Sequence, residues 1–221
     1  MPKKAGILLL TLGAVLILSA LLLFRHNSLE DERAGLEAEA MLIDVRAAIS
    51  ERAEQAPAPT PTPPESAAGA PVETPVPELT VVEIDGQEYV GYLSIPALEI
   101  ELPVMSGWDY DKLKLAPCRQ FGSTRTDDLV IAAHNYKRHF GGLSSLSAGD
   151  TITFTDMDGE VSTYAVAKVE TLDPKAVEAV QNSGYDLVLY TCTYGGASRV
   201  TAFCNRALAA VKPGSDVSAA E

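Results

Sequence analysis

The stretch DLVLYTCTYGGASRVTAFCNR, residues 186–206, indicates the fold and contains two side chains suited to catalysis. Two runs rich in β-branched and aromatic residues flank Thr193–Ser198, a segment of six residues with two adjacent glycines. This pattern predicts a β-hairpin. If Cys192 and Arg199 face each other at its mouth, their side chains project to the same side of the sheet. The hairpin would then present a thiol and a guanidinium to one reacting group.

The chain has three cysteines, and an odd number leaves at least one thiol without a disulfide partner inside the chain. Cys204 lies an odd number of residues after Arg199, so in a regular strand it projects to the opposite face of the sheet. We therefore expect Cys192 to be a free thiol. Cys118, in an APCRQ turn, and His139, in a polar YKRHF loop, are expected to be structural.

A histidine ends another predicted strand. The run LVIAA, residues 129–133, is followed by His134 and Asn135. A histidine beside a thiol stabilises the thiolate and donates a proton, and strand ends meet readily in a barrel. The alternatives are a buried apolar role for Cys192, a structural loop role for His134 and a surface role for Arg199.

Strand-like runs separated by turns recur through residues 79–221, which we expect to form one head domain. Asp158-Gly159 between two of these runs predicts a hairpin. Short helices are expected only around Gly141–Leu146 and Asp173–Gln181. Many short strands with few helices favour a β-sandwich or a closed barrel. The predicted strands are 90–95, 100–105, 129–133, 151–155, 161–170, 185–191 and 199–204.

The N-terminal part has a different composition. Ala5–Phe24 is a run of 20 uncharged residues, and a helix of that length spans roughly 30 Å, the thickness of a bilayer hydrocarbon core. We expect residues 1–27 to form a cytoplasmic tip and an uncleaved single-pass anchor, rather than a cleaved signal peptide. Lys3 and Lys4 favour a cytoplasmic N-terminus and an extracellular head.

Two segments separate the anchor from the head. Residues 28–55 are predicted to form a juxtamembrane helix, a mostly solvated spacer with a thin apolar stripe of Leu36, Ala40, Ile43 and Ala47. Residues 56–78 form a proline-rich linker, because proline at this density disfavours helix and sheet. We expect the linker to act as a stalk that holds the head away from the membrane.

The overall composition excludes one class of partner. The formal net charge of -13 argues against nucleic acid, since phosphate binding requires a basic face. The cysteines and histidines lack the spacing of a zinc site, and the sequence contains no glycine-rich phosphate loop.

Three motifs in order resemble the sortase family of cysteine transpeptidases over residues 89–206. VGYLSIPALEIELPV (90–104) is similar to the two opening strands, VIAAHN (130–135) places His134 at the position of the catalytic histidine, and LYTCTYGGASRV (189–200) aligns Cys192 and Arg199 with the cysteine and arginine. Val188 departs from the threonine of the best-known family motif. The short loop after Cys192 resembles class B or clostridial-type members.

The resemblance implies a mainly β, closed sortase-like barrel and an acyl transfer reaction. Cys192 would attack the threonine carbonyl of an LPXTG-like sorting signal, His134 would act as acid and base, and Arg199 would stabilise the oxyanion. Thr191 and Asn135 would bind the substrate. Neither a cofactor nor a metal is expected, because Asp156 and Asp158 suit a turn better than a calcium site.

The implied partners are secreted proteins with a C-terminal sorting signal, an acceptor amine of the peptidoglycan bridge or of a pilin lysine, and the cell membrane. Two alternatives stay open. A hydrolytic cysteine peptidase could use the same cysteine and histidine, and a surface adhesin or assembly module would have no catalytic role.

Overall fold

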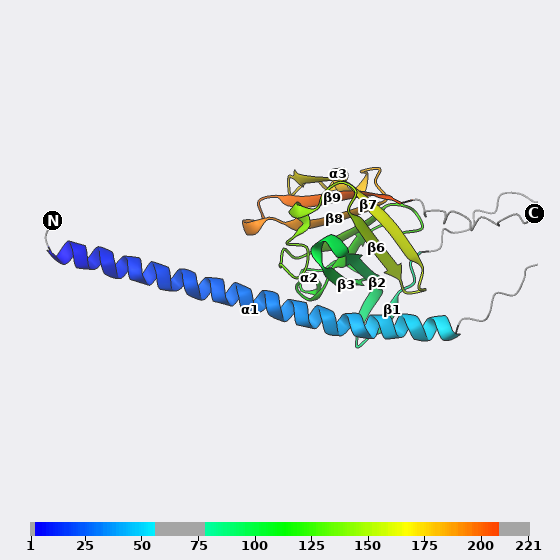
Figure 1. Ribbon diagram of the computed structural model, residues 1–221, viewed down its shortest axis with the longest axis horizontal. Helices are drawn as coiled ribbons and strands as arrows, with labels where there is room; N and C mark the ends of the chain where they lie inside the picture. Colours follow the sequence, from blue (N-terminus) through cyan, green and yellow to red (C-terminus); the bar gives the residue numbers. More distant parts are fainter. Residues whose placement is uncertain (1–2, 56–77, 208–221) are drawn as a thin grey trace, which may run out of the picture.

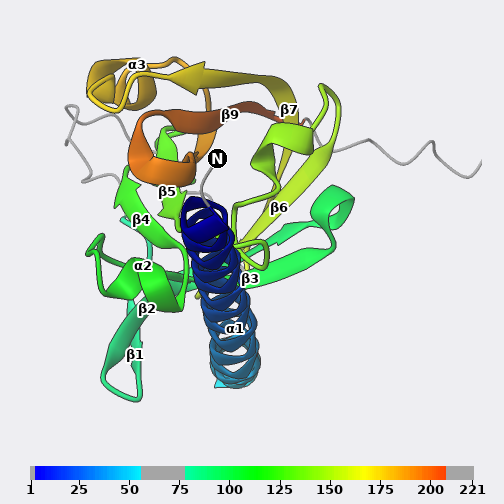
Figure 2. The same cartoon turned by 90° about the vertical axis from the view of Figure 1, so that its left-hand side faces the viewer.

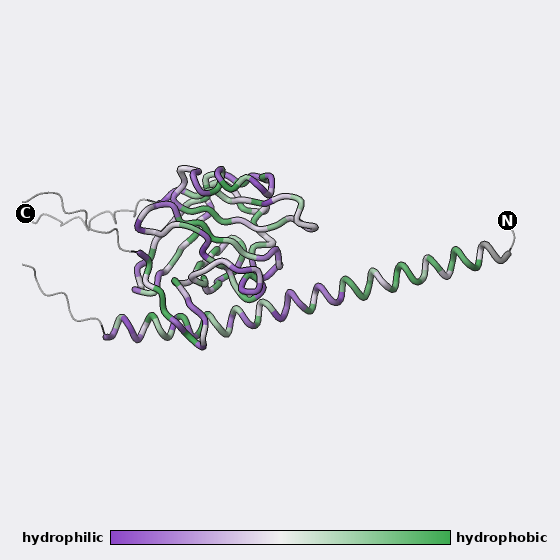
Figure 3. The backbone as a smooth tube through the Cα atoms, turned by 180° about the vertical axis from the view of Figure 1, so that it is seen from behind, coloured by the Kyte–Doolittle hydropathy of each residue, from purple (hydrophilic) through white to green (hydrophobic). Residues whose placement is uncertain are grey.

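A long N-terminal helix lies beside a β-barrel in the computed structural model, which describes residues 3–55 and 78–207 (Figure 1). The helix α1 (Lys3–Gln55) is continuous through the predicted anchor and the predicted spacer. Its N-terminal half is hydrophobic, whereas its C-terminal half carries both polar and apolar residues (Figure 3). Most of the predicted proline-rich linker, residues 56–77, lies outside the described residues.

Eight strands close into a barrel in the order β2-β3-β4-β5-β8-β9-β7-β6, and β6 pairs again with β2. The strand β1 extends the sheet beyond β2. The prediction of a mainly β, closed barrel is therefore confirmed. The strands are β1 (Val82–Ile84), β2 (Gln87–Ile95), β3 (Ile100–Met105), β4 (Cys118–Phe121), β5 (Leu129–Ala133), β6 (Thr151–Asp156), β7 (Val161–Leu172), β8 (Leu187–Cys192) and β9 (Arg199–Arg206).

Seven of these strands match predicted runs, while β1 and β4 were not predicted. The placement of Cys118 in a turn is wrong, because Cys118 opens β4 and is fully buried. Four residues are too few to show alternation, and β4 is held by distant partners, Met105 on β3 and Ala132 on β5.

The short helices include the two that were predicted, the 3-10 turn Leu143–Ser145 and α3 (Val177–Gln181). The others are α2 (Lys112–Leu115) and 3-10 turns at Pro96–Leu98 and Tyr194–Gly196. Asp158 and Gly159 lie in the turn between β6 and β7, as expected, and Gly159 has a φ of +81°.

All five residues of β5 are buried, because apolar side chains cover both of its faces. Leu129 and Ile131 belong to the main core of the barrel, while Val130 packs in a separate cluster with Val188 and Phe203. Full burial of a side chain of this size contributes about 1.5–3 kcal/mol. The strand β5, which leads to His134, is therefore fixed by apolar packing on both of its faces.

The helix α1 packs against the barrel, so the prediction of a mostly solvated spacer is wrong. The predicted stripe faces solvent, with Leu36 63% and Ile43 65% exposed. The buried positions are Ala34, Gly35, Ala38, Leu42 and Val45. Both stripes have helical spacing and two alanines each, but only the buried face includes a glycine, which allows a close approach to the barrel.

Polar contacts fix the register of α1 on the barrel. Arg46 pairs with Glu101 of β3 at 2.6 Å, and the Oδ1 of Asp31 accepts a hydrogen bond from the backbone N–H of Arg138 at 3.1 Å. The Arg138 side chain crosses the helix at Gly35, where a Cβ atom would overlap it.

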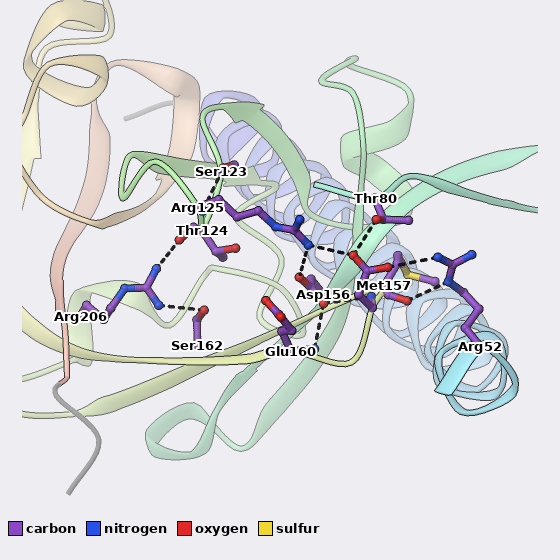
Figure 4. A network of polar contacts seen from close by, with 11 residues as sticks. Arg52, Thr80, Ser123, Thr124, Arg125, Asp156, Met157, Glu160, Ser162 and Arg206 are labelled. Carbon is purple, nitrogen blue, oxygen red and sulfur yellow. Dashed lines mark hydrogen bonds and ion pairs between the residues drawn. The ribbon is translucent and has the colours of Figure 1, made fainter. Parts of the chain in front are cut away.

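A polar network joins the C-terminal end of α1 to the turn between β6 and β7 (Figure 4). Arg52 donates to the carbonyl of Met157 at 3.2 Å and pairs with Asp158 at 3.1 Å. Arg125 pairs with Asp158 at 2.8 Å and with the buried Asp156 at 3.4 Å. The two aspartates therefore neutralise arginines within this network.

Candidate active site

The hairpin of β8 and β9 has the predicted register, with Cys192 paired to Arg199. The loop between them is closed by hydrogen bonds from the Thr193 N–H to the Ser198 carbonyl at 3.0 Å and from the Ser198 N–H to the Thr193 Oγ1 at 3.1 Å. Gly195 has a φ of +81°, a left-handed conformation that favours glycine. Local sequence thus places the thiol at the end of a strand.

Parallel pairing of β5 with β8 brings the histidine to the same end of the barrel as the thiol. Ala133 and Thr191 form the last residue pair between β5 and β8, and His134 and Cys192 each follow this pair directly in the chain. The Thr191 hydroxyl donates to the Ala133 carbonyl at 2.9 Å and is buried. This bond joins the two strands one residue before the thiol and the imidazole.

Cys192, His134 and Asn135 line one open groove with a volume of about 1020 Å³. The loop residues Thr193–Gly196 form another part of its wall, and the Tyr194 side chain is 91% exposed. The structure thus brings together three of the five residues that the sequence predicted. Thr191 does not line this groove, because its hydroxyl is bound to the Ala133 carbonyl.

The orientation of His134 is set by two neighbours. Its Nδ1 lies 3.0 Å from the Oδ1 of Asn135, and the Tyr136 ring stacks on the imidazole with centroids 4.1 Å apart and planes 10° apart. An amide oxygen only accepts hydrogen bonds, so Nδ1 carries the proton. The Nε2 atom is left to exchange a proton. Tyr136 was not predicted, although it follows His134 by two residues.

Cys192 differs from the other two cysteines in its exposure. All three thiols are free, as predicted for Cys192, but only Cys192 is partly exposed. Burial raises the pKa of Cys118 to about 11 and that of Cys204 to about 12, so both are protonated at neutral pH. A nucleophilic cysteine must form a thiolate that a substrate can approach, and Cys192 is the cysteine that fits.

Arg199 lies beside Cys192 on the neighbouring strand, but its guanidinium faces a second pocket. Its Nη1 donates to the carbonyls of Gly196 and Ser198, both at 3.1 Å. The second pocket has a volume of about 180 Å³ and a mixed polar and apolar lining, and Arg199 lies in its wall. Its lining includes Trp108, Tyr110, Phe121, Leu172, Val177 and Val180.

Part of the groove wall comes from α1, which sequence reasoning did not include. Phe24, Asn27, Ser28, Glu30 and Asp31 line the groove together with the thiol and the imidazole. The sequence offers no indication of this, because it depends on how the helix docks. No cluster of three or more potential metal ligands occurs among residues 3–55 and 78–207.

The sequence of the barrel is similar to that of known proteins. The model of the sortase domain matches residues 93–207. Sortase A of Bacillus anthracis is 29% identical over 121 residues, which cover 52% of this chain and 57% of that protein. The chain therefore spans less than two thirds of the length of this relative.

Two solved structures are similar to parts of this chain. Sortase A from Corynebacterium diphtheriae has a TM-score of 0.50 at 22% identity, over 58% of this chain and 64% of that one. Sortase C1 from Streptococcus agalactiae has a TM-score of 0.48 at 26% identity, over 57% and 71%. The class B or clostridial-type assignment stays a prediction. With the domain model matching more than half of its length, the chain belongs to the sortase family.

Proposed function

We propose that the protein is a membrane-anchored cysteine transpeptidase that cleaves an LPXTG-like sorting signal and transfers the new carboxyl end to an amine. The observation that carries this proposal is the partly exposed Cys192 thiol, which shares one groove with His134 while the other two cysteines are buried. Family membership supports the same reaction class.

In the first half of the reaction, the Cys192 thiolate attacks the threonine carbonyl of the sorting signal. The tetrahedral intermediate collapses as the bond to the following residue breaks, and protonated His134 donates its Nε2 proton to the departing amine. The products are a thioester on Cys192 and a free amine. The stacked Tyr136 and the Oδ1 of Asn135 hold the imidazole in the required orientation.

In the second half, an acceptor amine attacks the thioester and His134 removes its proton. The thioester carbon–sulfur bond breaks, an amide forms and the Cys192 thiolate is restored, so the cycle consumes no cofactor. We propose a peptidoglycan bridge or a pilin lysine as the source of the amine, in line with the family.

Arg199 is proposed to stabilise the oxyanion or to orient the bound peptide. It faces Cys192 across the hairpin, and its guanidinium carries a permanent charge and several donors. The adjoining pocket offers apolar side chains, among them Trp108, Phe121 and Val177, to the leucine and proline of an extended sorting signal. For Thr191 we propose a positioning role rather than substrate binding, since it joins the strands that carry the thiol and the imidazole.

The N-terminal helix supports the membrane part of the proposal. Within Gly6–Gln55, one window of 18 residues has a mean hydropathy of 2.9 and none of it is buried. A single helix of this kind near the N-terminus fits a span. We propose a cytoplasmic N-terminus and an extracellular barrel, and secreted proteins with a sorting signal as substrates.

The test supplies a sorting peptide with and without triglycine to the full chain in detergent. The proposal expects a triglycine adduct and a trapped thioester with the unmodified protein, and neither with Cys192→Ala. Cys118→Ala is the matched control, because it removes a buried thiol outside the groove. Release of free acid alone, even with triglycine, would identify a peptidase.

Thiol labelling of the native protein separates the remaining alternative. One thiol per chain should react before denaturation and three after it. An adhesin or assembly module without a catalytic role predicts a Cys192 that does not react before denaturation, and no cleavage of any sorting peptide.

A further inference from the structure

The active-site groove and the exit of α1 from its apolar segment lie at the same end of the molecule. Figure 2 looks along α1 from its N-terminus and shows the β8–β9 hairpin on the near side, next to the helix. Phe24, the last residue of the apolar run, lines the groove together with Cys192 and His134. The groove therefore opens toward the side from which the apolar segment extends.

The contacts of α1 prevent the barrel from swinging on the helix. Polar contacts occur at Asp31, Arg46 and Arg52, and between them Ala38 and Val45 are 0% exposed. At 1.5 Å per residue, the docked length from Asp31 to Arg52 is about 30 Å. Because α1 is continuous from the apolar run into this docked part, barrel and apolar segment are held by one rigid element.

The height of the groove above a bilayer follows from the helix rise. From Phe24 to Asp31 the chain advances seven residues, or about 10 Å along the helix. Each headgroup layer is roughly 5–7 Å thick. The wall of the groove thus begins at the hydrocarbon boundary and ends just beyond the headgroups.

We propose that α1 acts as a molecular ruler, which holds the groove containing Cys192 within about 10 Å of the hydrocarbon boundary and directs it toward the bilayer. This inference rests on the proposed function and adds a geometric limit to it: in a substrate held in the same membrane, the cleavage site must come within that distance of the boundary. An extended chain advances about 3.3–3.6 Å per residue, so roughly three residues cover this distance.

The ruler is tested by inserting seven helix-forming residues between Arg25 and His26, neither of which lines the groove. Seven residues lengthen the helix by about 10 Å and leave its facing direction within about 20°. The substrates are vesicle-inserted polypeptides with the sorting motif placed zero to ten residues from their own span. The shortest spacer that yields product should be no longer than about three residues for the unmodified protein and about three residues longer for the insertion variant.

A seven-residue glycine–serine insertion at the same position is the matched control. A flexible link lets the barrel approach the membrane, so the shortest spacer should not increase. Both insertions move Phe24 away from the groove wall, so cleavage of a soluble sorting peptide is compared between the helical and the flexible variant. It should agree within about twofold between these two variants, because residues 27–55 remain docked in both. An unchanged shortest spacer in the helical variant, with soluble cleavage intact, would overturn the ruler and leave the proposed function standing.

A second readout does not depend on activity. A fluorophore attached to Cys192, the only partly exposed thiol, reports its distance from acceptor dyes on lipid headgroups. Energy transfer should fall in the helical variant and not in the flexible one. Equal transfer in the unmodified and helical proteins would refute the ruler even if no substrate were cleaved.

Discussion

Acidification should destabilise this protein through His139. The side chain is 0% exposed, and neither ring nitrogen has a hydrogen-bond partner. Burial lowers the pKa of His139 from 6.5 to about 4, while the adjacent backbone of Ala34 in α1 opposes the change. The Tyr136 ring lies 5.5 Å away, and the charges of His134 and Asp31 have smaller effects on the pKa.

The sign of this pH dependence follows from which state of the protein, folded or unfolded, binds more protons. Between pH 6.5 and about 4 the imidazole is protonated in the unfolded chain and neutral in the folded one, so the unfolded state binds more protons. Stability therefore rises with pH across this window and is lost as the pH falls. The difference between the two pKa values, at about 1.4 kcal/mol per pH unit, corresponds to roughly 3 kcal/mol between pH 7 and pH 4.

Urea unfolding of the full chain in detergent, followed by the fluorescence of the single tryptophan Trp108, measures this loss. Burial raises the pKa of Asp158, but hydrogen bonds from Thr80, Arg52 and Arg125 together outweigh it and lower the pKa below 3.8. The stability that this carboxylate contributes is therefore lost only as the pH falls below about 3.8, outside the range in which His139 acts.

His139→Phe is the matched control for this measurement. It keeps an aromatic ring and removes both unpaired nitrogens, so it should raise stability at pH 7 by about 1 kcal/mol and flatten the dependence between pH 6.5 and 4. The same slope in both proteins would refute the assignment to His139.

Three further changes test the docking of α1 and the site. Val45→Ala should lower the unfolding free energy by about 2 kcal/mol in urea titrations, whereas Ile43→Ala on the exposed face should change it by less than about 0.5 kcal/mol; equal losses would contradict the docked face. Thr191→Val removes the hydrogen bond to the Ala133 carbonyl and should cost about 1–2 kcal/mol, whereas Thr191→Ser should stay close to the unmodified protein. A neutral valine variant would rule out the strand-joining role. Arg199→Lys should lower kcat/KM on a sorting peptide by about 100-fold, because one ammonium does not reproduce the planar fork, and unchanged turnover would remove Arg199 from the mechanism.

Much of the barrel was predictable because its longer strands carry enough residues to show their pattern. The strand 100–105 and the strand 129–133 were predicted with the bounds that the structure has. Val188 lies inside β8 and is 1% exposed, as expected for a strand interior. The three-residue β1 and the four-residue β4 were missed, since their hydrogen bonds, not their composition, make them strands.

The site was predictable where its geometry is local. The pairing of Cys192 with Arg199 depends on a six-residue loop, whose closure entropy is small, and on glycines that allow it. The pocket that Arg199 lines was not predictable from the sequence. It depends on residues such as Trp108 and Leu172 that meet only in the folded barrel.

The sequence alone determined the apolar N-terminal run, the hairpin that carries Cys192, the candidate histidine and the β-rich character of residues 79–207, because these depend on neighbours in the chain. The tertiary structure decided which face of α1 is buried, how far the barrel lies from the apolar run and which cysteine remains reachable. Residues 34, 38, 42 and 45 and residues 36, 40, 43 and 47 satisfy helical periodicity equally well. Only the shape and charge of the barrel surface distinguish the two faces, and this complementarity exists only after β-strands distant in sequence have paired.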